Sequence, residues 1–245
     1  MELFHLINAN IFFAKQKGPG KLHHGKEKAY DWNGTTAPSV DNWNAFVLEK
    51  YGADDVETQK KAYAEVIVKE FAERYGSKVD GWWFDHADKG NIPLLHEICK
   101  AANPKALLTY NIGGHGAHAV QNNSPPYEDY THGHPTPMRR ASPSSTENLP
   151  MITTIEESDN GFMIKDGKAS LGHMFMPMME KWNLGDTVMW PEDQAVEWMG
   201  RVLKAGGAWT WNVPMDDKES KLIDLSTDFA TKVGTELEIE GLGGL

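Results

Sequence analysis

The stretch from Lys78 to Asn111 predicts a strand, a helix and a second strand in close succession. Its first segment, residues 79–85 (VDGWWFD), is aromatic and too short for a helix, which favours a strand buried on both faces. A helix over 93–102 and a strand over 106–111 follow, ended by Asn103-Pro104 and by Gly113-Gly114. Such a unit places two parallel strands side by side and connects them through the helix.

The same alternation extends along the chain. Apolar residues recur at spacings of three and four over 56–75, which predicts an amphipathic helix that ends at Gly76. The β-branched run 150–157 predicts a strand, and residues 192–233 predict a helix (192–204), a strand (208–213) and a last helix (216–233). We therefore predict one α/β domain over residues 1–245, a (β/α)8 barrel of the TIM type.

In a parallel α/β barrel the active site lies at the carboxyl ends of the strands. Polar residues occupy that position in each predicted strand: Asp85, Asn111, Glu156, Glu157 and Asn212. Burying a carboxylate directly after Trp82-Trp83-Phe84 costs free energy unless hydrogen bonds or ion pairs compensate. A carboxylate in such a position therefore more often has a functional role than none. The alternative is that Asp85 caps the next helix or pairs with Arg74 or Lys89.

Charge and cysteine content exclude several classes of protein. The formal net charge of −11 argues against a nucleic-acid partner, because phosphate binding requires a positive surface. Cys99 is the only cysteine, which excludes an intramolecular disulfide and a cysteine-built zinc site. No run approaches the roughly 18 apolar residues of a membrane span, and residues 1–14 make a poor signal peptide. We expect a soluble protein with no membrane partner, its location and homo-oligomeric state open.

Paired carboxylates suggest glycoside hydrolysis, which usually needs two carboxyl groups across the scissile bond. Glu157 or Glu156 could supply the second group beside Asp85. The alternative is that the two glutamates form a solvated turn.

Histidines are frequent in the long irregular segment 113–148, where His115, His118, His132 and His134 could converge. Their spacing matches none of the strong zinc patterns, although a metal site remains an alternative. Neutral imidazoles also suit sugar hydroxyls as hydrogen-bond partners. We predict that His132 and His134 bind substrate, with no metal and no cofactor.

Aromatic and polar residues elsewhere extend the predicted sugar-binding set. The chain has nine tryptophans, whose indole faces can stack on sugar rings or fill a core. The first long loop, residues 18–45, is either an exposed loop without a functional role or part of the sugar-binding site. The further candidates for sugar contact are His23, His24, Trp32, Trp83, His86 and Trp211.

Two of these segments resemble a known family. Glu73-Arg74-Tyr75-Gly76 followed by residues 79–85 resembles the nucleophile segment of the α-L-fucosidases of glycoside hydrolase family 29, and residues 202–214 (VLKAGGAWTWNVP) resemble the family's last barrel unit. The resemblance covers about residues 45–233 in order. It implies a TIM barrel in which Asp85 is the nucleophile, and proteins of this family are often periplasmic or secreted.

The chain departs from the family pattern twice. Some members carry the acid/base glutamate in a Thr-Pro-Glu stretch, where this chain has Thr136-Pro137-Met138. The acid/base role is therefore assigned to Glu157 or Glu156. Asp85 also comes too early for the fourth strand of eight, so we expect a barrel that lacks its first units or is completed by a partner chain.

These observations predict a retaining exo-glycosidase that hydrolyses terminal α-L-fucosyl or related glycosides by double displacement. One alternative is a carbohydrate-binding relative that lacks the acid/base and does not catalyse. A second alternative is a metal-dependent hydrolase that uses the loop histidines.

Overall fold

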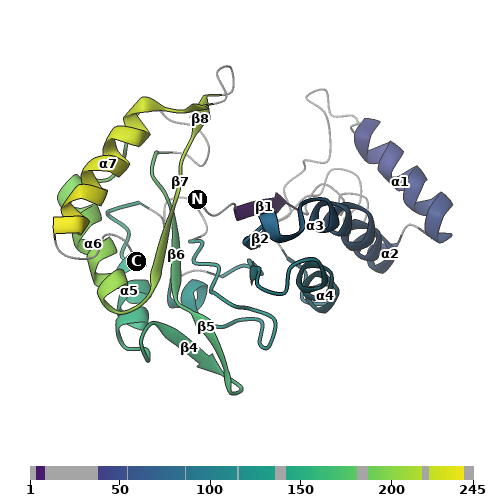
Figure 1. The fold of residues 1–245 in the computed structure, drawn as a ribbon, viewed down its shortest axis with the longest axis horizontal. Helices are drawn as coiled ribbons and strands as arrows, with labels where there is room; N and C mark the ends of the chain where they lie inside the picture. Colours follow the sequence, from purple (N-terminus) through teal and green to yellow (C-terminus); the bar gives the residue numbers. More distant parts are fainter. Residues whose placement is uncertain are drawn as a thin grey trace. The chain divides into compact units, whose positions relative to one another are not determined.

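The computed structural model describes residues 4–8, 38–53, 55–85, 87–114, 116–135, 142–180, 187–216 and 221–239. The chain divides into two compact units, which we call the N-terminal unit (Met1–Ile112) and the C-terminal unit (Gly113–Leu245). Helices and strands alternate in each of them (Figure 1). The predicted mixed α/β fold is confirmed at this level.

Three parallel strands form the sheet of the N-terminal unit. They are β1 (Phe4–Asn8), β2 (Gly81–Asp85) and β3 (Leu107–Tyr110), in the order β1-β2-β3. In the β2–β3 register, Trp83 lies opposite Thr109 and Phe84 opposite Tyr110. The predicted strand, helix and strand between Lys78 and Asn111 are therefore confirmed.

Side chains of β2 alternate between the two faces of this sheet, as in any strand. On one face the rings of Trp82, Phe84 and Tyr110 stack, with centroids 5.8 Å and 5.4 Å apart, and all three side chains are buried. Trp83 and Asp85 therefore belong to the opposite face. The aromatic run thus supplies both a packed face and a face that ends in a carboxylate.

Helices of the N-terminal unit follow the predicted periodicity. After α1 (Pro38–Tyr51), the predicted helix 56–75 is confirmed as α2 (Val56–Ala62), a π-helical turn η3 (Tyr63–Val68) and α3 (Lys69–Tyr75). A short 3₁₀ turn, η4 (Gly76–Lys78), leads into β2, and α4 (Ile92–Ala102) connects β2 to β3. Cys99 of α4 is fully buried, as expected of a core thiol.

The C-terminal unit contains a parallel pair, β6 (His173–Pro177) and β7 (Ala208–Asn212), connected through α6 (Glu192–Lys204). The predicted helix 192–204 and the strand over 208–213 are confirmed. Ahead of β6 come the 3₁₀ helix η5 (Gly116–Val120), helix α5 (Asn148–Glu156) and an antiparallel hairpin of β4 (Phe162–Lys165) and β5 (Lys168–Leu171). The short strands β8 (Met215–Asp216) and β9 (Lys221–Leu222) and helix α7 (Asp224–Ile239) end the unit.

The core of the C-terminal unit lies on one face of the β6–β7 pair. Met174 and Met176 of β6 are fully buried there with Ile152, Trp198 and Val233 from the three helices α5, α6 and α7. Indole rings of Trp190, Trp209 and Trp211 pack edge to face, with centroids 5.1 to 6.0 Å apart. The alternate residues of β6 and β7, among them His173 and Thr210, consequently face the other way.

A close backbone contact explains the Gly-Gly turn between α6 and β7. Gly206 has φ +84° and follows the end of α6, a left-handed position that favours glycine. A Cβ atom there would lie 2.5 Å from the carbonyl oxygen of Asn160, and a Cβ on Gly161 would lie 2.4 Å from the carbonyl carbon of Gly206. Only residues without a side chain allow the two chain segments to touch.

One predicted element is wrong, and another is confirmed with a different start. Residues 150–157 are not a strand, because they form most of helix α5, whose buried residues Asn148, Met151, Ile152 and Ile155 follow a helical spacing. The last helix begins at Asp224 instead of residue 216, and Leu222 and Leu225 are exposed by 49% and 44%. In α5, burial of one helical face decides the outcome over local propensity. Ahead of α7, residues 215–216 and 221–222 instead form the antiparallel strands β8 and β9.

Among the described residues, no helix is both long and apolar enough to cross a membrane.

Candidate active site

Asp85 ends β2, and its carboxylate is held by the residue that follows β3. The side-chain amide of Asn111 donates a hydrogen bond from Nδ2 to Asp85 Oδ1 at 2.8 Å. Asn111 is itself fixed by its backbone, since its N–H donates to the Phe84 carbonyl and its carbonyl accepts from the Ala87 N–H, both at 2.8 Å. A buried asparagine thus orients a partly exposed carboxylate at the carboxyl end of the sheet.

Trp83 and Thr109 share this face of the sheet with Asp85 and Asn111, because each lies two residues before one of them in the strands. Trp83 is 6% exposed. The Thr109 hydroxyl is fully buried and has no hydrogen-bond partner among the described residues. Sequence analysis missed Thr109; strand alternation from Asn111 would have identified it.

In the C-terminal unit, residues 130–134 run beside β6 and contain His132 and His134. The Thr131 N–H donates to the Leu171 carbonyl at 2.8 Å, and the Phe175 N–H donates to the Gly133 carbonyl at 3.0 Å. Gly133 has φ +62°, and a Cβ atom there would lie 2.2 Å from the His173 carbonyl oxygen. The Gly between His132 and His134 is therefore required for the segment to lie against β6.

The His173 side chain of β6 hydrogen-bonds both to this segment and to β7. Its Nδ1 lies 3.0 Å from the Thr131 carbonyl oxygen, so Nδ1 must carry the proton, and Nε2 then accepts from the Thr210 hydroxyl at 2.9 Å. Burial lowers the pKa of His173 to about 4. His173 is thus a neutral structural histidine that was not among the predicted site residues.

His132 and His134 differ in accessibility. His132 is fully buried, and its Nδ1 accepts the backbone N–H of His134 at 3.1 Å. Burial, with smaller effects from His134, His118 and His173, lowers the pKa of His132 to about 3. His134 is partly exposed, and its ring lies 5.8 Å from that of Phe175. Of the two, His134 is the more accessible to solvent.

Asn212 ends β7 as predicted, and its carbonyl accepts the Met178 N–H at 3.1 Å. Strand alternation puts Asn212 on the same face as Thr210. Trp211 points to the opposite face, where its ring lies 5.2 Å from Trp190 and 5.9 Å from Phe229. Trp211 therefore packs in the aromatic core, which was the alternative to sugar contact.

Glu156 and Glu157 do not end a strand, which corrects the premise of their assignment. Glu156 is the last residue of α5, and Arg201 of α6 donates from Nε and Nη2 to its two carboxylate oxygens, both at 2.8 Å. Hydrogen bonds from Arg201 lower the pKa of Glu156. A proton donor needs the opposite shift.

Histidines at 23, 24, 86 and 115, Trp32 and Met138 lie outside the described residues, so their predicted roles stay predictions. Among the residues that the structure describes, no group of three or more His, Cys, Asp or Glu side chains is arranged to hold a metal ion.

Comparisons with known proteins point to enzymes that act on fucoidan. The family model for endo-alpha(1,4)-fucoidanase Mef1 matches residues 116–224. No curated protein matches the sequence. Endo-fucoidan hydrolase MfFcnA4 of glycoside hydrolase family 107 aligns over 96% of this chain and 38% of its own, at 20% identity and TM-score 0.67. P5AFcnA of the same family aligns over 95% of this chain and 64% of its own, at 18% identity and TM-score 0.68.

The likeness to α-L-fucosidases is weaker. The fucosidase AlfC in complex with Fuca(1,6)GlcNAc aligns over 98% of this chain and 61% of its own, at 12% identity and TM-score 0.50. The resemblance to family 29 is therefore wrong as a family assignment, since both the matching family model and the better structural alignments are those of endo-fucoidanases.

The chain spans between 38% and 64% of the length of these three proteins. Its fold is the one found in part of the family 107 endo-fucoidan hydrolases.

Proposed function

We propose that this chain forms part of an endo-acting glycoside hydrolase that cleaves fucoidan, a fucose-rich polysaccharide bearing sulfate esters. The family model over residues 116–224 and the fold shared with endo-fucoidan hydrolases support this substrate class. Cleavage inside a polymer replaces the predicted release of terminal fucose.

Asp85 is the proposed nucleophile, and its hydrogen bond with Asn111 is the observation that carries the assignment. In a double displacement, the carboxylate oxygen attacks the anomeric carbon as the bond to the leaving oxygen breaks, and a general acid protonates that oxygen. Water then displaces the carboxylate, and the configuration is retained. Asn111 holds the carboxylate in one orientation, which lowers the entropy cost of the attack.

The proton donor is not proposed to be Glu156, because its carboxylate is bound by Arg201. Glu157 follows the end of α5 and is exposed, so its assignment stays a prediction without support from a strand end.

Asn111, His134 and Asn212 are proposed to contact sugar hydroxyls. Asn111 follows β3 and Asn212 ends β7, each at the carboxyl end of a parallel strand, whereas His134 ends the segment 130–134 that hydrogen-bonds to β6. The (β/α)8 barrel, incomplete at its N-terminus, stays a proposal of its own, supported by parallel pairing in both units.

The test is hydrolysis of fucoidan by the wild-type protein, Asp85→Asn and Asp80→Asn. Asp80 is exposed and lies immediately before the same strand, so Asp80→Asn is the matched control. We expect an early fall in mean polymer length for the wild type and the control, and none for Asp85→Asn. The first-formed anomer, observed by NMR, reports retention. Release of fucose monomer without shortening of the polymer would contradict the endo-acting mode, and binding without hydrolysis would favour the non-catalytic alternative.

A further inference from the structure

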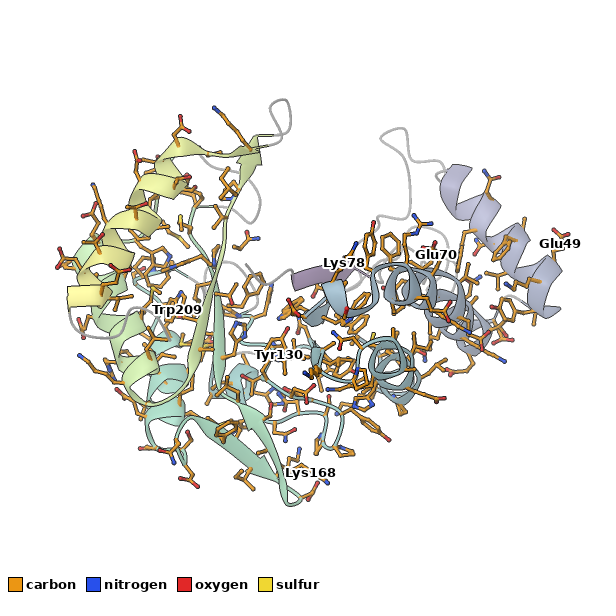
Figure 2. All side chains as sticks on the ribbon, viewed as in Figure 1. Glu49, Glu70, Lys78, Tyr130, Lys168 and Trp209 are labelled. Carbon is orange, nitrogen blue, oxygen red and sulfur yellow. The ribbon has the colours of Figure 1, made fainter. Side chains whose placement is uncertain are left out.

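The tip of the β4–β5 hairpin carries two lysines that face each other. Asp166 (φ +51°) and Gly167 (φ +71°) form a two-residue turn with positive φ at both positions, the geometry of a type I′ hairpin. Lys165 and Lys168 flank the turn as cross-strand partners, and both side chains are exposed. Figure 2 shows Lys168 at the end of the hairpin.

Neither ammonium group forms an ion pair with a described residue, whereas Arg201 is paired with Glu156 and Lys232 with Glu192. Like charges placed directly opposite each other on a hairpin destabilise it. A ligand with negative charge that bridges both lysines would remove this repulsion. The arrangement is notable in a chain whose net charge is −11.

The hairpin backbone is anchored, so the Cα atoms of the two lysines have a fixed spacing. The β5 strand pairs with β4 on one edge, and on the other the Leu171 N–H donates to the Asp129 carbonyl at 2.9 Å. The Asn122 side-chain amide donates to the Lys168 carbonyl at 3.2 Å. A site built on such a support loses little entropy when a ligand binds.

The buried carboxyl of Glu128, which interacts electrostatically with Lys165, does not cancel this charge at neutral pH. Glu128 is 3% exposed, its Oε2 accepts the Asn123 N–H at 3.1 Å, and Oε1 has no partner among the described residues. Burial raises the pKa of Glu128 to about 8, an effect reduced by the Lys165 ammonium and increased slightly by Asp129. Glu128 is therefore protonated and neutral under these conditions.

We propose that Lys165 and Lys168 together bind a sulfate group of an anionic polysaccharide, at a surface site separate from Asp85. The choice of ligand rests on the proposed function, because sulfate esters are the anions that fucoidan presents. The site would hold a long substrate on the protein during repeated cleavage.

The experiment is affinity electrophoresis in gels that contain fucoidan or chemically desulfated fucoidan. Three proteins are compared: the wild type, Lys165→Gln/Lys168→Gln and a control double variant, Lys78→Gln/Lys105→Gln. The control removes two exposed lysines of the N-terminal unit, which form no ion pair with a described residue and are not cross-strand partners. Both variants change the net charge equally, so their mobilities in empty gels correct for charge.

We expect fucoidan to retard the wild type and the control, and the apparent Kd of the hairpin variant to rise about fivefold, the size expected from losing exposed ion contacts. Desulfated fucoidan should retard none of the three. Equal retardation of the two double variants, or retardation of the wild type by the desulfated polymer, would overturn the proposal.

Hydrolysis separates this inference from the proposed function. The hairpin variant should cleave short fucoidan oligosaccharides at the wild-type rate, since neither lysine belongs to the proposed catalytic set. A wild-type protein that is retarded by fucoidan through the hairpin but never cleaves it would refute the proposed function and leave the hairpin site intact.

Discussion

The side-chain amide of Asn111 lies 2.8 Å from the carboxylate of Asp85, joining the carboxyl ends of β3 and β2. Replacing Asn111 by Ala should leave the carboxylate in place without its orienting donor. We expect kcat on fucoidan to fall about 10- to 100-fold, the usual cost of misplacing a reacting group, with a smaller change in KM. Because Asn111 is buried, near-UV circular dichroism must show that the variant folds. A folded variant with unchanged kcat would show that the hydrogen bond does not serve catalysis.

The ion pair between Glu156 and Arg201 predicts that Glu156→Gln has little effect on activity. It should lower the free energy of unfolding by about 0.2–1 kcal/mol, as for other largely exposed pairs. Arg201→Gln and the double variant complete a thermodynamic cycle, measured by urea denaturation. The stabilisation is present above the carboxyl's unfolded pKa and is lost as the pH falls through its lowered folded pKa. Abolished hydrolysis in Glu156→Gln would return this residue to the proton-donor role.

Burial of His132 and His173 predicts a protein that loses stability in mild acid. Their pKa values are about 3 and about 4 in the fold, against about 6.5 when unfolded. The unfolded chain binds more protons below about pH 6.5, so stability should decrease steadily from there towards about pH 4, by a few kcal/mol. Urea denaturation across this range measures the slope.

The variant that tests this slope is His173→Gln, which should flatten the pH dependence. If His173→Gln does not fold, calorimetry in buffers of different ionisation enthalpy still counts the protons that the wild type takes up on unfolding. Fewer than one proton near pH 5 would refute the prediction.

Two glycines with positive φ should respond differently to alanine. Gly167 has φ +71° and open space around its Cα, whereas a Cβ on Gly133 would lie 2.2 Å from the His173 carbonyl oxygen. Gly167→Ala should cost about 1 kcal/mol, the conformational penalty alone. Gly133→Ala should cost several times that amount, because residues 130–134 must move off β6. Similar unfolding midpoints for the two variants would mean that the clash is relieved without cost.

Protonation of Glu128 should make fucoidan binding depend on pH. As the pH rises through about 8 this carboxyl becomes negative beside Lys165, so the apparent Kd of the wild type should increase. Glu128→Gln stays neutral and should bind equally at about pH 7 and about pH 9, below the usual lysine range. The same loss of affinity in both proteins would show that Glu128 does not influence the lysine pair.

Sequence patterns identified those elements in which propensity and burial agree. β2 is aromatic and buried, and α6 has both an apolar face and a Gly-Gly end, so each was predicted within a few residues. In helix α5 local propensity and burial disagree, because the β-branched residues Ile152, Thr153 and Thr154 favour a strand. Its Asn148, Met151, Ile152 and Ile155 nevertheless repeat with a helical period and are all buried. The period was the better evidence.

The hairpin and β6 were missed for different reasons. Asp166-Gly167 is a strong hairpin signal that was available in the sequence. Strand β6 (HMFMP) has methionines where branched residues usually mark a strand, and its partner segment 130–134 pairs with it only across a long separation in the chain. The structural role of His173 depends on Thr131 and Thr210, which no local pattern connects.

The indole cluster around Trp190 gives the C-terminal unit an optical signature of its own. Four rings, those of Trp190, Trp198, Trp209 and Trp211, form edge-to-face contacts with centroids 5.1 to 6.0 Å apart. The strong short-wavelength transitions of indoles at such separations couple, so the far-ultraviolet dichroism should contain a paired exciton band. The loss of that band would report the unfolding of the α6–α7 side of the C-terminal unit without any added label.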